Sequence, residues 1–177
     1  LGSGDNDPTL DAGFFVKAKV GDFVWHDQNG NGIQDAGEPG INGATVTLTG
    51  TDGQGNVVSL TTTTAGNGMY MFGDLVPGTY KITFTTPAGG YTVTSADEGA
   101  NDATDSDAGA MGMTPEFTVT SGDTILPFDA GYYQPAKIGN FVWNDLNANG
   151  IQDAGEPGIG GVEVLLSGTE GDGDIVN

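Results

Sequence analysis

The sequence duplicates itself at a fixed distance, and this feature limits the folds open to it more than any other. The string D-Q-N-G-N-G-I-Q-D-A-G-E from Asp27 to Glu38 returns as D-L-N-A-N-G-I-Q-D-A-G-E from Asp145 to Glu156, which is 145 − 27 = 118 residues later. The agreement extends further, since Gly21 to Trp25 matches Gly139 to Trp143 at the same offset. A repeat of this length is too long for a solenoid unit and has the size of an independently folding domain. We therefore expect similar domains in series.

The duplication also divides the chain. We predict that residues 1–16 are the final strand of a preceding repeat, residues 17–135 a complete repeat, and residues 136–177 the opening strands of a following repeat. A few strands cannot complete a core by themselves. Either the chain is a window cut from a continuous array, or the leading strand of one copy completes the trailing half-domain of another by strand addition. A trailing half-domain completed by strand addition would still lack counterparts of residues 61–120. We therefore favour the interpretation that the chain is a segment of a continuous array.

Alternating apolar and threonine side chains indicate β-strands with one buried face. Val46 and Leu48 alternate with threonines, and so do Ile82 and Phe84. Clusters of Gly, Asp, Asn and Pro separate such runs, which is typical of a β-sandwich. We predict an all-β sandwich in tandem copies, with no helix longer than one turn. The expected strands lie near residues 18–25, 44–50, 56–64, 69–72, 79–86, 91–94, 114–120 and 124–133.

The repeated twelve-residue string has the spacing of a calcium-binding loop. Oxygen-bearing side chains stand at loop positions 1, 3, 5, 9 and 12, and a glycine stands at position 6. The two copies differ only at positions 2 and 4, where no ligand is expected. Plain turns also favour Asn, Asp and Gly, but they need no carboxylate at position 12. The predicted Ca²⁺ ligands are Asp27, Asn29, Asn31, the Ile33 carbonyl, Asp35 and Glu38 in the first copy, and Asp145, Asn147, Asn149, the Ile151 carbonyl, Asp153 and Glu156 in the second.

The residues around this loop are not those of a helix-loop-helix calcium sensor. The upstream segment 20–25 is β-branched and aromatic, and Pro39-Gly40 downstream blocks a helix. We therefore expect the loop to connect strands and to act as a structural clamp.

A second acidic stretch covers residues 97–107, which hold four aspartates and one glutamate. It is either a solvated loop or, because its charges repel one another, a second cation site. We predict a second site, with Asp102, Asp105 and Asp107 as its ligands. Asp129, beside an apolar strand, is a weaker candidate that would otherwise accept backbone hydrogen bonds.

Composition narrows the partners and the compartment. The chain has 24 acidic and 4 basic side chains, a net charge of −20, and no cysteine. Such a charge argues against nucleic acid and anionic membranes and favours cations. No apolar run approaches the roughly 20 residues of a membrane span. Loops of this type stay filled where calcium is abundant, so we expect an exported, extracellular location.

An enzymatic role finds no support in the residues. His26 is the only histidine and its counterpart is Asn144, so a Ser-His-Asp or Cys-His arrangement is excluded for a repeated domain. Trp25 and Trp143 follow the alternation of their strands and are expected to anchor cores rather than to stack on sugars.

Several motifs together resemble a known family. They are Gly21-Asp22-Phe23-Val24-Trp25, Glu38-Pro39-Gly40-Ile41, Gly68-Met69-Tyr70-Met71-Phe72, Leu75-Val76-Pro77-Gly78-Thr79-Tyr80 and Asp129-Ala130-Gly131-Tyr132-Tyr133. The chain resembles the B repeats of serine-aspartate repeat (Sdr-type) bacterial surface adhesins over nearly its whole length. The resemblance implies calcium-stabilised, immunoglobulin-like or Cna B-type (prealbumin-like) sandwiches, placed between a ligand-binding head and a wall anchor. It also implies a location on the bacterial cell surface or in the secreted fraction.

Two functions remain open at this point. The first is a structural repeat of an adhesin stalk or extracellular fibre, whose partners are neighbouring repeats. The second is a ligand-binding adhesion module that recognises a host protein or a glycan through exposed loops such as Ser95 to Met113. A contiguous exposed aromatic patch would favour the second function.

Overall fold

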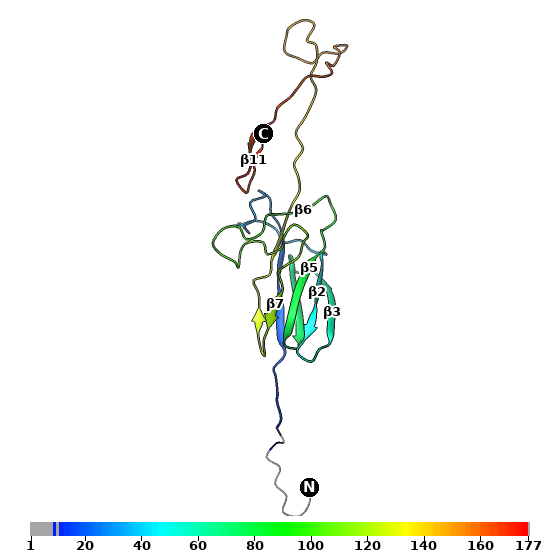
Figure 1. Cartoon of the computed structure of the whole chain (residues 1–177). Helices are drawn as coiled ribbons and strands as arrows, with labels where there is room; N and C mark the ends of the chain where they lie inside the picture. The colour runs from blue at the N-terminus through cyan, green and yellow to red at the C-terminus, as the bar shows by residue number, and fades with distance from the viewer. Residues whose placement is uncertain (1–8, 10, 177) are drawn as a thin grey trace, which may run out of the picture.

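The complete repeat folds as two β-sheets packed face to face (Figure 1). The computed structural model describes residue 9 and residues 11–176, and within them the regular elements are all strands. One sheet consists of β4 (Met69–Leu75), β1 (Ala18–His26), β9 (Ala130–Tyr133) and β6 (Thr92–Val93), with β8 (Thr124–Ile125) also paired to β1. The other sheet consists of β3 (Val57–Thr63), β2 (Thr45–Asp52), β5 (Gly78–Phe84) and β7 (Phe117–Val119). The predicted all-β sandwich is confirmed.

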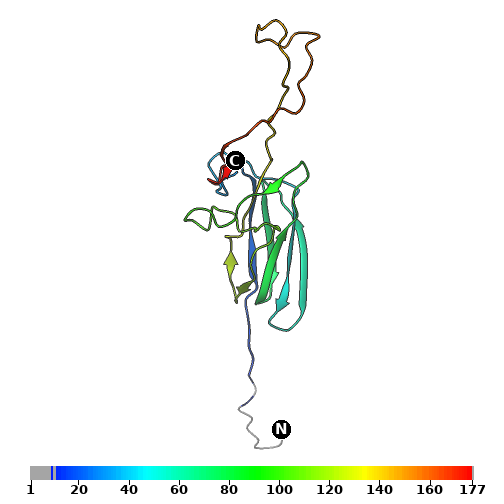
Figure 2. The same ribbon diagram turned by 45° about the horizontal axis from the view of Figure 1, so that its top comes forward.

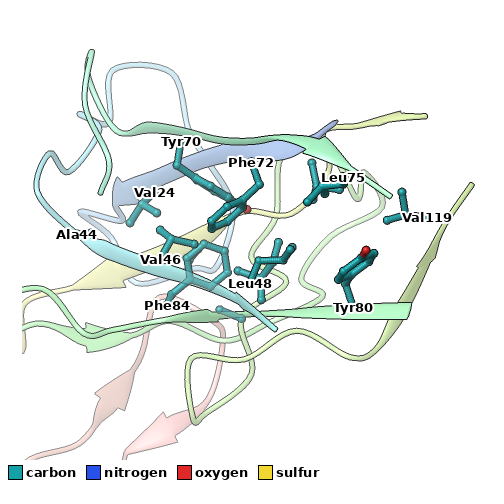
Figure 3. Packing of buried hydrophobic residues seen from close by; sticks show 14 of the residues in the cluster. Val24, Ala44, Val46, Leu48, Tyr70, Phe72, Leu75, Tyr80, Phe84 and Val119 are labelled. Atoms are coloured by element: carbon teal, nitrogen blue, oxygen red, sulfur yellow. The ribbon is translucent and has the colours of Figure 1, made fainter. Parts of the chain in front are cut away.

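The core lies between the sheets, and its members come from the alternating positions of the strands (Figure 3). Val46 and Leu48 on β2 and Ile82 on β5 are fully buried. They face Val24 on β1 and Phe72 on β4 across the layer. The threonines between them on β2 and β5 are partly or fully exposed. The period-two pattern thus predicted both the strands and the side that each one buries.

One expected strand, 124–133, is two strands in the structure. β8 pairs in parallel with Lys19 and Val20 of β1, and β9 pairs in parallel with Val24 to His26. Between them the chain contains Pro127, which has no N–H to donate to a ladder. The Asp129 carboxylate accepts the Phe23 N–H at 3.0 Å instead. The Asp129 side chain therefore replaces a backbone acceptor at the point where the pairing with β1 is interrupted.

The strand directions place different loops at the two ends of the sandwich. At the N-terminal pole, the start of β1 pairs with the end of β4 (Ala18 with Leu75), and the end of β2 pairs with the start of β5 (Asp52 with Gly78). At the C-terminal pole, β1 and β9 both end, and His26 pairs with Tyr132. The chain therefore enters at one pole and leaves at the other, as Figures 1 and 2 show.

The flanking segments contain little regular structure. Residues 11–16 form no strand, and the rest of the predicted leading strand lies outside the described residues. Residues 139–143 also form no strand, although they match part of β1. The strands that pair with β1 have no counterparts before residue 177. Within residues 136–176 the strands are β10 (Gly168–Thr169) and β11 (Ile175–Val176), which pair with the register of β2 and β3. Trp143 and Gly158 form an isolated antiparallel bridge, as Trp25 and Gly40 do in the complete repeat.

Candidate metal-binding loops

The first predicted loop begins directly after β1, at the C-terminal pole. The chain returns from the loop along the end of the same strand, where His26 N–H donates to Pro39 O at 2.9 Å and Ile41 N–H donates to Val24 O at 2.8 Å. Both ends of the loop are thereby held by β1, and no helix flanks it. The expectation that this loop lies in a β-framework is confirmed.

Asp27, at loop position 1, is fully buried and organises the first half of the loop. Its carboxylate accepts the backbone N–H of Gly30 at 2.6 Å and of Gly32 at 2.9 Å. The Thr94 hydroxyl donates to Asp27 Oδ2 at 2.6 Å, from the segment after β6. The buried carboxylate is thus satisfied by dipoles alone, without a basic side chain.

Asn29 and Asn31, at positions 3 and 5, shape the turn around the loop. Each side-chain oxygen accepts a backbone N–H two residues later, at 3.1 Å from Asn31 and at 2.8 Å from Ile33. Each side-chain amide donates to Asp35 Oδ2, at 2.9 and 3.0 Å. The side chains at positions 3, 5 and 9 therefore converge on the inside of the loop.

Glu38, at position 12, closes the loop. Its carboxylate accepts Gln28 N–H at 2.7 Å and Asp35 N–H at 3.0 Å, so it bridges the beginning and the end of the string. Among residues 9 and 11–176 the salt bridge is a single pair, Lys17 with Asp74 at 3.8 Å. The three loop carboxylates therefore have no cationic partner among the residues that the structure describes.

The second loop repeats this network almost bond for bond. Glu156 accepts Leu146 N–H at 2.9 Å and Asp153 N–H at 3.0 Å. The side-chain amides of Asn147 and Asn149 both donate to Asp153 Oδ2 at 2.8 Å. These hydrogen bonds hold the pKa of Asp153 below its ordinary value. The remaining predicted ligands, Asp145 and Ile151, occupy the same places: Gly150 N–H donates to Asp145 and Ile151 N–H donates to Asn149. The loop geometry therefore forms without the rest of its domain.

The acidic stretch 97–107 packs directly against the first loop. Gln34 N–H donates to Thr104 O at 2.7 Å and Ser106 N–H donates to Gly32 O at 3.1 Å, while Ile33 and Asp105 form a β-bridge. Gly32 has φ +77°, and a Cβ there would lie 2.7 Å from Glu98 Cγ. The two acidic segments, which are about 60 to 80 residues apart in the sequence, thus form one continuous patch.

The three predicted ligands of the second site lie in this patch, but at different depths. Asp105 is 5 % exposed, and its Oδ1 has no hydrogen-bond partner. Burial, followed by the charges of Asp102 and Asp97, raises the pKa of Asp105. Burial raises the pKa of Asp107 to about 7, and its Oδ2 accepts Asp129 N–H at 2.7 Å. Asp102 is exposed and acts on both carboxyls through its charge.

The acidic cluster continues into the sandwich through Asp129, the weaker candidate, and Asp22. Asp129 is 1 % exposed, and burial together with the charge of Asp22 raises its pKa to about 9. Burial raises the pKa of Asp22, on β1, to about 6. Asp22 is not among the ligands predicted from the sequence. Its one signal was an acid inside a β-branched and aromatic strand, at a position where the second copy carries Asn140.

Within the described residues, no three Asp, Glu or His side chains converge as a closed metal centre. The loops instead combine carboxylates with Asn side chains and backbone groups. A cavity of about 830 Å³ lies beside the first loop, lined in part by residues 28–30, 92–96 and 133–136.

The fold and the acidic loops define a β-sandwich domain with oxygen-rich loops at one pole. The sequence profile of the SdrD B-like domain matches residues 18–132 and again residues 136–176. The chain belongs to the SdrD B-like domain family. This is a family of structural domains, in agreement with the prediction that the chain is not an enzyme.

Relatives confirm the resemblance seen in the sequence. The chain is 42 % identical over 173 residues to the serine-aspartate repeat-containing protein D of Staphylococcus aureus, covering 96 % of this chain and 12 % of the relative. It is 43 % identical over 166 residues to the serine-aspartate repeat-containing protein F of Staphylococcus epidermidis, covering 92 % of this chain and 9 % of the relative. The chain therefore spans about a tenth of the length of these relatives.

Solved structures overlap with part of the fold. The minor pilin of Streptococcus agalactiae has a TM-score of 0.45 at 9 % identity, covering 71 % of this chain and 48 % of the pilin. The shaft pilin SpaA of Lactobacillus rhamnosus GG has a TM-score of 0.39 at 11 % identity, covering 70 % and 52 %. Residues 9 and 11–176 include no helix with the length and apolar character of a membrane span.

Proposed function

We propose that this chain is a calcium-stabilised structural repeat of a secreted or cell-surface adhesin stalk or extracellular fibre. The observation that carries the proposal is the first loop: Asp27 is buried, Glu38 closes the loop, and no cationic side chain of the described residues neutralises either carboxylate. Family membership supports the structural role.

The residues fit a Ca²⁺ ion by their chemistry. Ca²⁺ takes six to eight oxygen ligands, and this loop offers three carboxylates, two Asn oxygens and the Ile33 carbonyl. A bound ion would supply the positive charge that the loop lacks. β1 holds both ends of the loop, so the ligand atoms are in place only in the folded state. An ion that binds this state and not the unfolded chain stabilises the fold. At a free calcium concentration of 100 times Kd, one such site contributes about 2.7 kcal/mol.

A second ion is proposed for the patch beside the first loop. The unpartnered, buried Oδ1 of Asp105 supports it, because an unsatisfied buried carboxylate oxygen is costly without a ligand. Asp102 and Asp107 would complete the carboxylate set. This second site would attach the 97–107 stretch to the first loop, where Gln34, Ile33 and Gly32 already contact it.

The ligand-binding alternative receives less support from the surface. Between residues 17 and 135, the exposed large hydrophobic side chains are aliphatic, and none is aromatic. Within the 95–113 loop only Met111 is of this kind. A host protein or glycan as partner therefore remains the second candidate, and neighbouring repeats are the first.

The test is thermal unfolding of the 177-residue chain in calcium and in chelator. We expect a higher Tm in calcium, by about 4 °C for each kcal/mol of binding energy. Glu38→Gln removes most of that difference, because the amide carries no negative charge and replaces one of the two ligand oxygens with an NH2 group. That NH2 group also cannot accept the backbone N–H that the second oxygen of Glu38 accepts.

The matched control is Gln28→Leu at the neighbouring ligand-free position. Only the backbone N–H of Gln28 takes part in the closing bond, and Leu146 makes the same bond at 2.9 Å in the second loop. This variant keeps the full calcium response. Identical melting curves of the unsubstituted chain in calcium and chelator would refute the clamp.

A further inference from the structure

The C-terminal segment folds back onto the first calcium loop. The following turn, defined as residues 170–174 between β10 and β11, lies against the C-terminal pole of the complete repeat (Figures 1 and 2). Ser95 Oγ donates to Asp172 Oδ2 at 3.2 Å. The same turn lines the cavity beside the loop, together with residues 28–30 and 133–136. A piece of the next repeat thus contacts the loop of the preceding one.

Gly171 shows how closely the two backbones approach. A Cβ at this residue would overlap the Asn29 carbonyl oxygen and would lie 2.9 Å from the carbonyl carbon of Gly30. The φ of Gly171 is not in the left-handed region, so its conformation does not require glycine. Glycine is required at this position by the close approach of the two backbones. Asn29 and Gly30 are positions 3 and 4 of the calcium loop, so the turn rests on the loop backbone.

The strand directions allow every pair of successive repeats to make this contact. The following turn corresponds to residues 52–56 at a distance of 171 − 53 = 118, and Thr169 pairs with Ile175 as Thr51 pairs with Val57. In the complete repeat that turn lies at the N-terminal pole, where Gly53 N–H donates to Pro77 O at 2.6 Å. The calcium loop lies at the opposite pole. In a series of repeats, each such turn faces the loop of the repeat before it.

We propose that successive repeats dock end to end, with the β2–β3 turn of each repeat seated on the calcium loop of the preceding repeat. The docked turn brings Glu170, Asp172 and Asp174 toward an already acidic pole. Like charges repel, so an ion in the loop strengthens the docking. This calcium dependence rests on the proposed function, whereas the docking geometry does not. The partner is the next copy of the same domain.

The contact is small, which makes it sensitive to one residue. Residues 170–172 of the turn and residues 28–30 of the loop both line the cavity of about 830 Å³, so open space remains between the two segments beside their contact. Gly171→Leu therefore removes the docking. Gly160→Leu is the matched control, because Gly160 has no atom within 4 Å of an added Cβ, does not have a left-handed φ, and corresponds to Asn42 in the complete repeat.

The experiment measures the distance between the repeat and the following turn. The chain has no cysteine, so Ser59→Cys and Ser167→Cys, both at exposed positions, define one pair of spin labels for double electron–electron resonance. In calcium we expect a single narrow distance distribution. Gly171→Leu broadens it to that of a segment tethered by a flexible linker, and Gly160→Leu leaves it narrow.

The outcomes separate this inference from the proposed function. A broad distribution in the unsubstituted chain, while calcium still raises the Tm of the repeat, overturns the docking and leaves the clamp intact. A narrow distribution that Gly171→Leu broadens, without any effect of calcium on Tm, supports the docking and rejects the clamp. If Gly171→Leu and Gly160→Leu give the same narrow distribution, the docking surface is wrong.

Discussion

Asp27 and Asp145 have the same local sequence and different surroundings, which separates local from tertiary effects at single residues. Both accept the N–H of the glycine at loop position 6, at 2.9 and 2.8 Å. Only Asp27 is buried, and only Asp27 receives the Thr94 hydroxyl. For Asp145 the Gly150 N–H, with other loop amides, lowers the pKa. The loop bonds are therefore local, and the burial depends on the sandwich.

The buried carboxyl of Asp129 predicts a pH dependence of the calcium-free repeat. Its pKa of about 9 lies above the ordinary value of 3.8, so the folded state holds this proton more tightly than the unfolded state. The free energy of unfolding therefore falls as the pH rises from about 4 toward 9. Asp22 and Asp107, with pKa values of about 6 and 7, act in the same direction. The Tm without calcium is expected to be lower at pH 8 than at pH 5.

Asp129→Asn tests the assignment, because an amide carries no charge and its oxygen still accepts the Phe23 N–H. In calcium-free buffer we expect a smaller fall of Tm from pH 5 to pH 8 and a higher Tm at pH 8, by about 4 °C per kcal/mol. Asp74→Asn removes a charge from a side chain that is 86 % exposed, at a φ of 58° that Asn tolerates. This control is expected to follow the unsubstituted protein. A pH profile unchanged by Asp129→Asn would contradict the prediction.

At the scale of elements, the contrast between β1 and residues 139–143 shows what a strand requires. Val24 and Trp25 are buried in β1, whereas Phe141 is 45 % exposed in a segment without regular structure. The motif G-x-F-V-W is present in both. β1 is paired with β4, β8 and β9, and these partners come from residues 69–133. A β-propensity becomes a strand only when its neighbours exist.

This contrast predicts that a glycine-to-alanine substitution destabilises the protein at Gly21 and has no effect at the equivalent Gly139. In β1, a Cβ on Gly21 would overlap the Tyr70 carbonyl oxygen and lie 2.8 Å from Met71 Cα, so Gly21→Ala pushes β1 and β4 apart. We expect a loss of about 1–3 kcal/mol in the free energy of unfolding. Gly139→Ala meets no atom within 4 Å and is expected to leave the urea midpoint of the chain unchanged. Equal midpoints for both variants would show that the β1–β4 pairing is not as close as described.

At the scale of the whole molecule, the opposite poles for entry and exit of the chain favour a linear array. Because β1 and β9 are parallel neighbours, the chain leaves the repeat at the pole opposite to its start, beside the first acidic loop. Successive repeats joined through residues 133–139 therefore extend in one direction. A net charge of −20 adds repulsion between repeats, which bound ions would reduce.

This arrangement predicts the length of longer arrays. In chains of two, three and four complete repeats in calcium, the maximum dimension from small-angle X-ray scattering is expected to grow by a constant increment per repeat. Chelator is expected to make the growth weaker than linear, because undocked repeats behave as a flexible chain. A compact particle, or a length that ignores the removal of calcium, would speak against the stiffened stalk.

The sequence by itself determined the hydrogen bonds within both loops, because they join residues close together in the chain and recur in both copies. Its alternation of apolar side chains and threonines also indicated the core positions on β2 and β5, which are buried where the partner strands are present. Only the tertiary structure decided what depends on distant partners. It brought the 97–107 stretch onto the first loop and placed Asp22 beside Asp129. It also broke the strand 124–133 in two and set Gly171 against Asn29. Such contacts arise from packing between segments far apart in the chain. The periodicity and spacing of residues describe only local structure and therefore do not predict them.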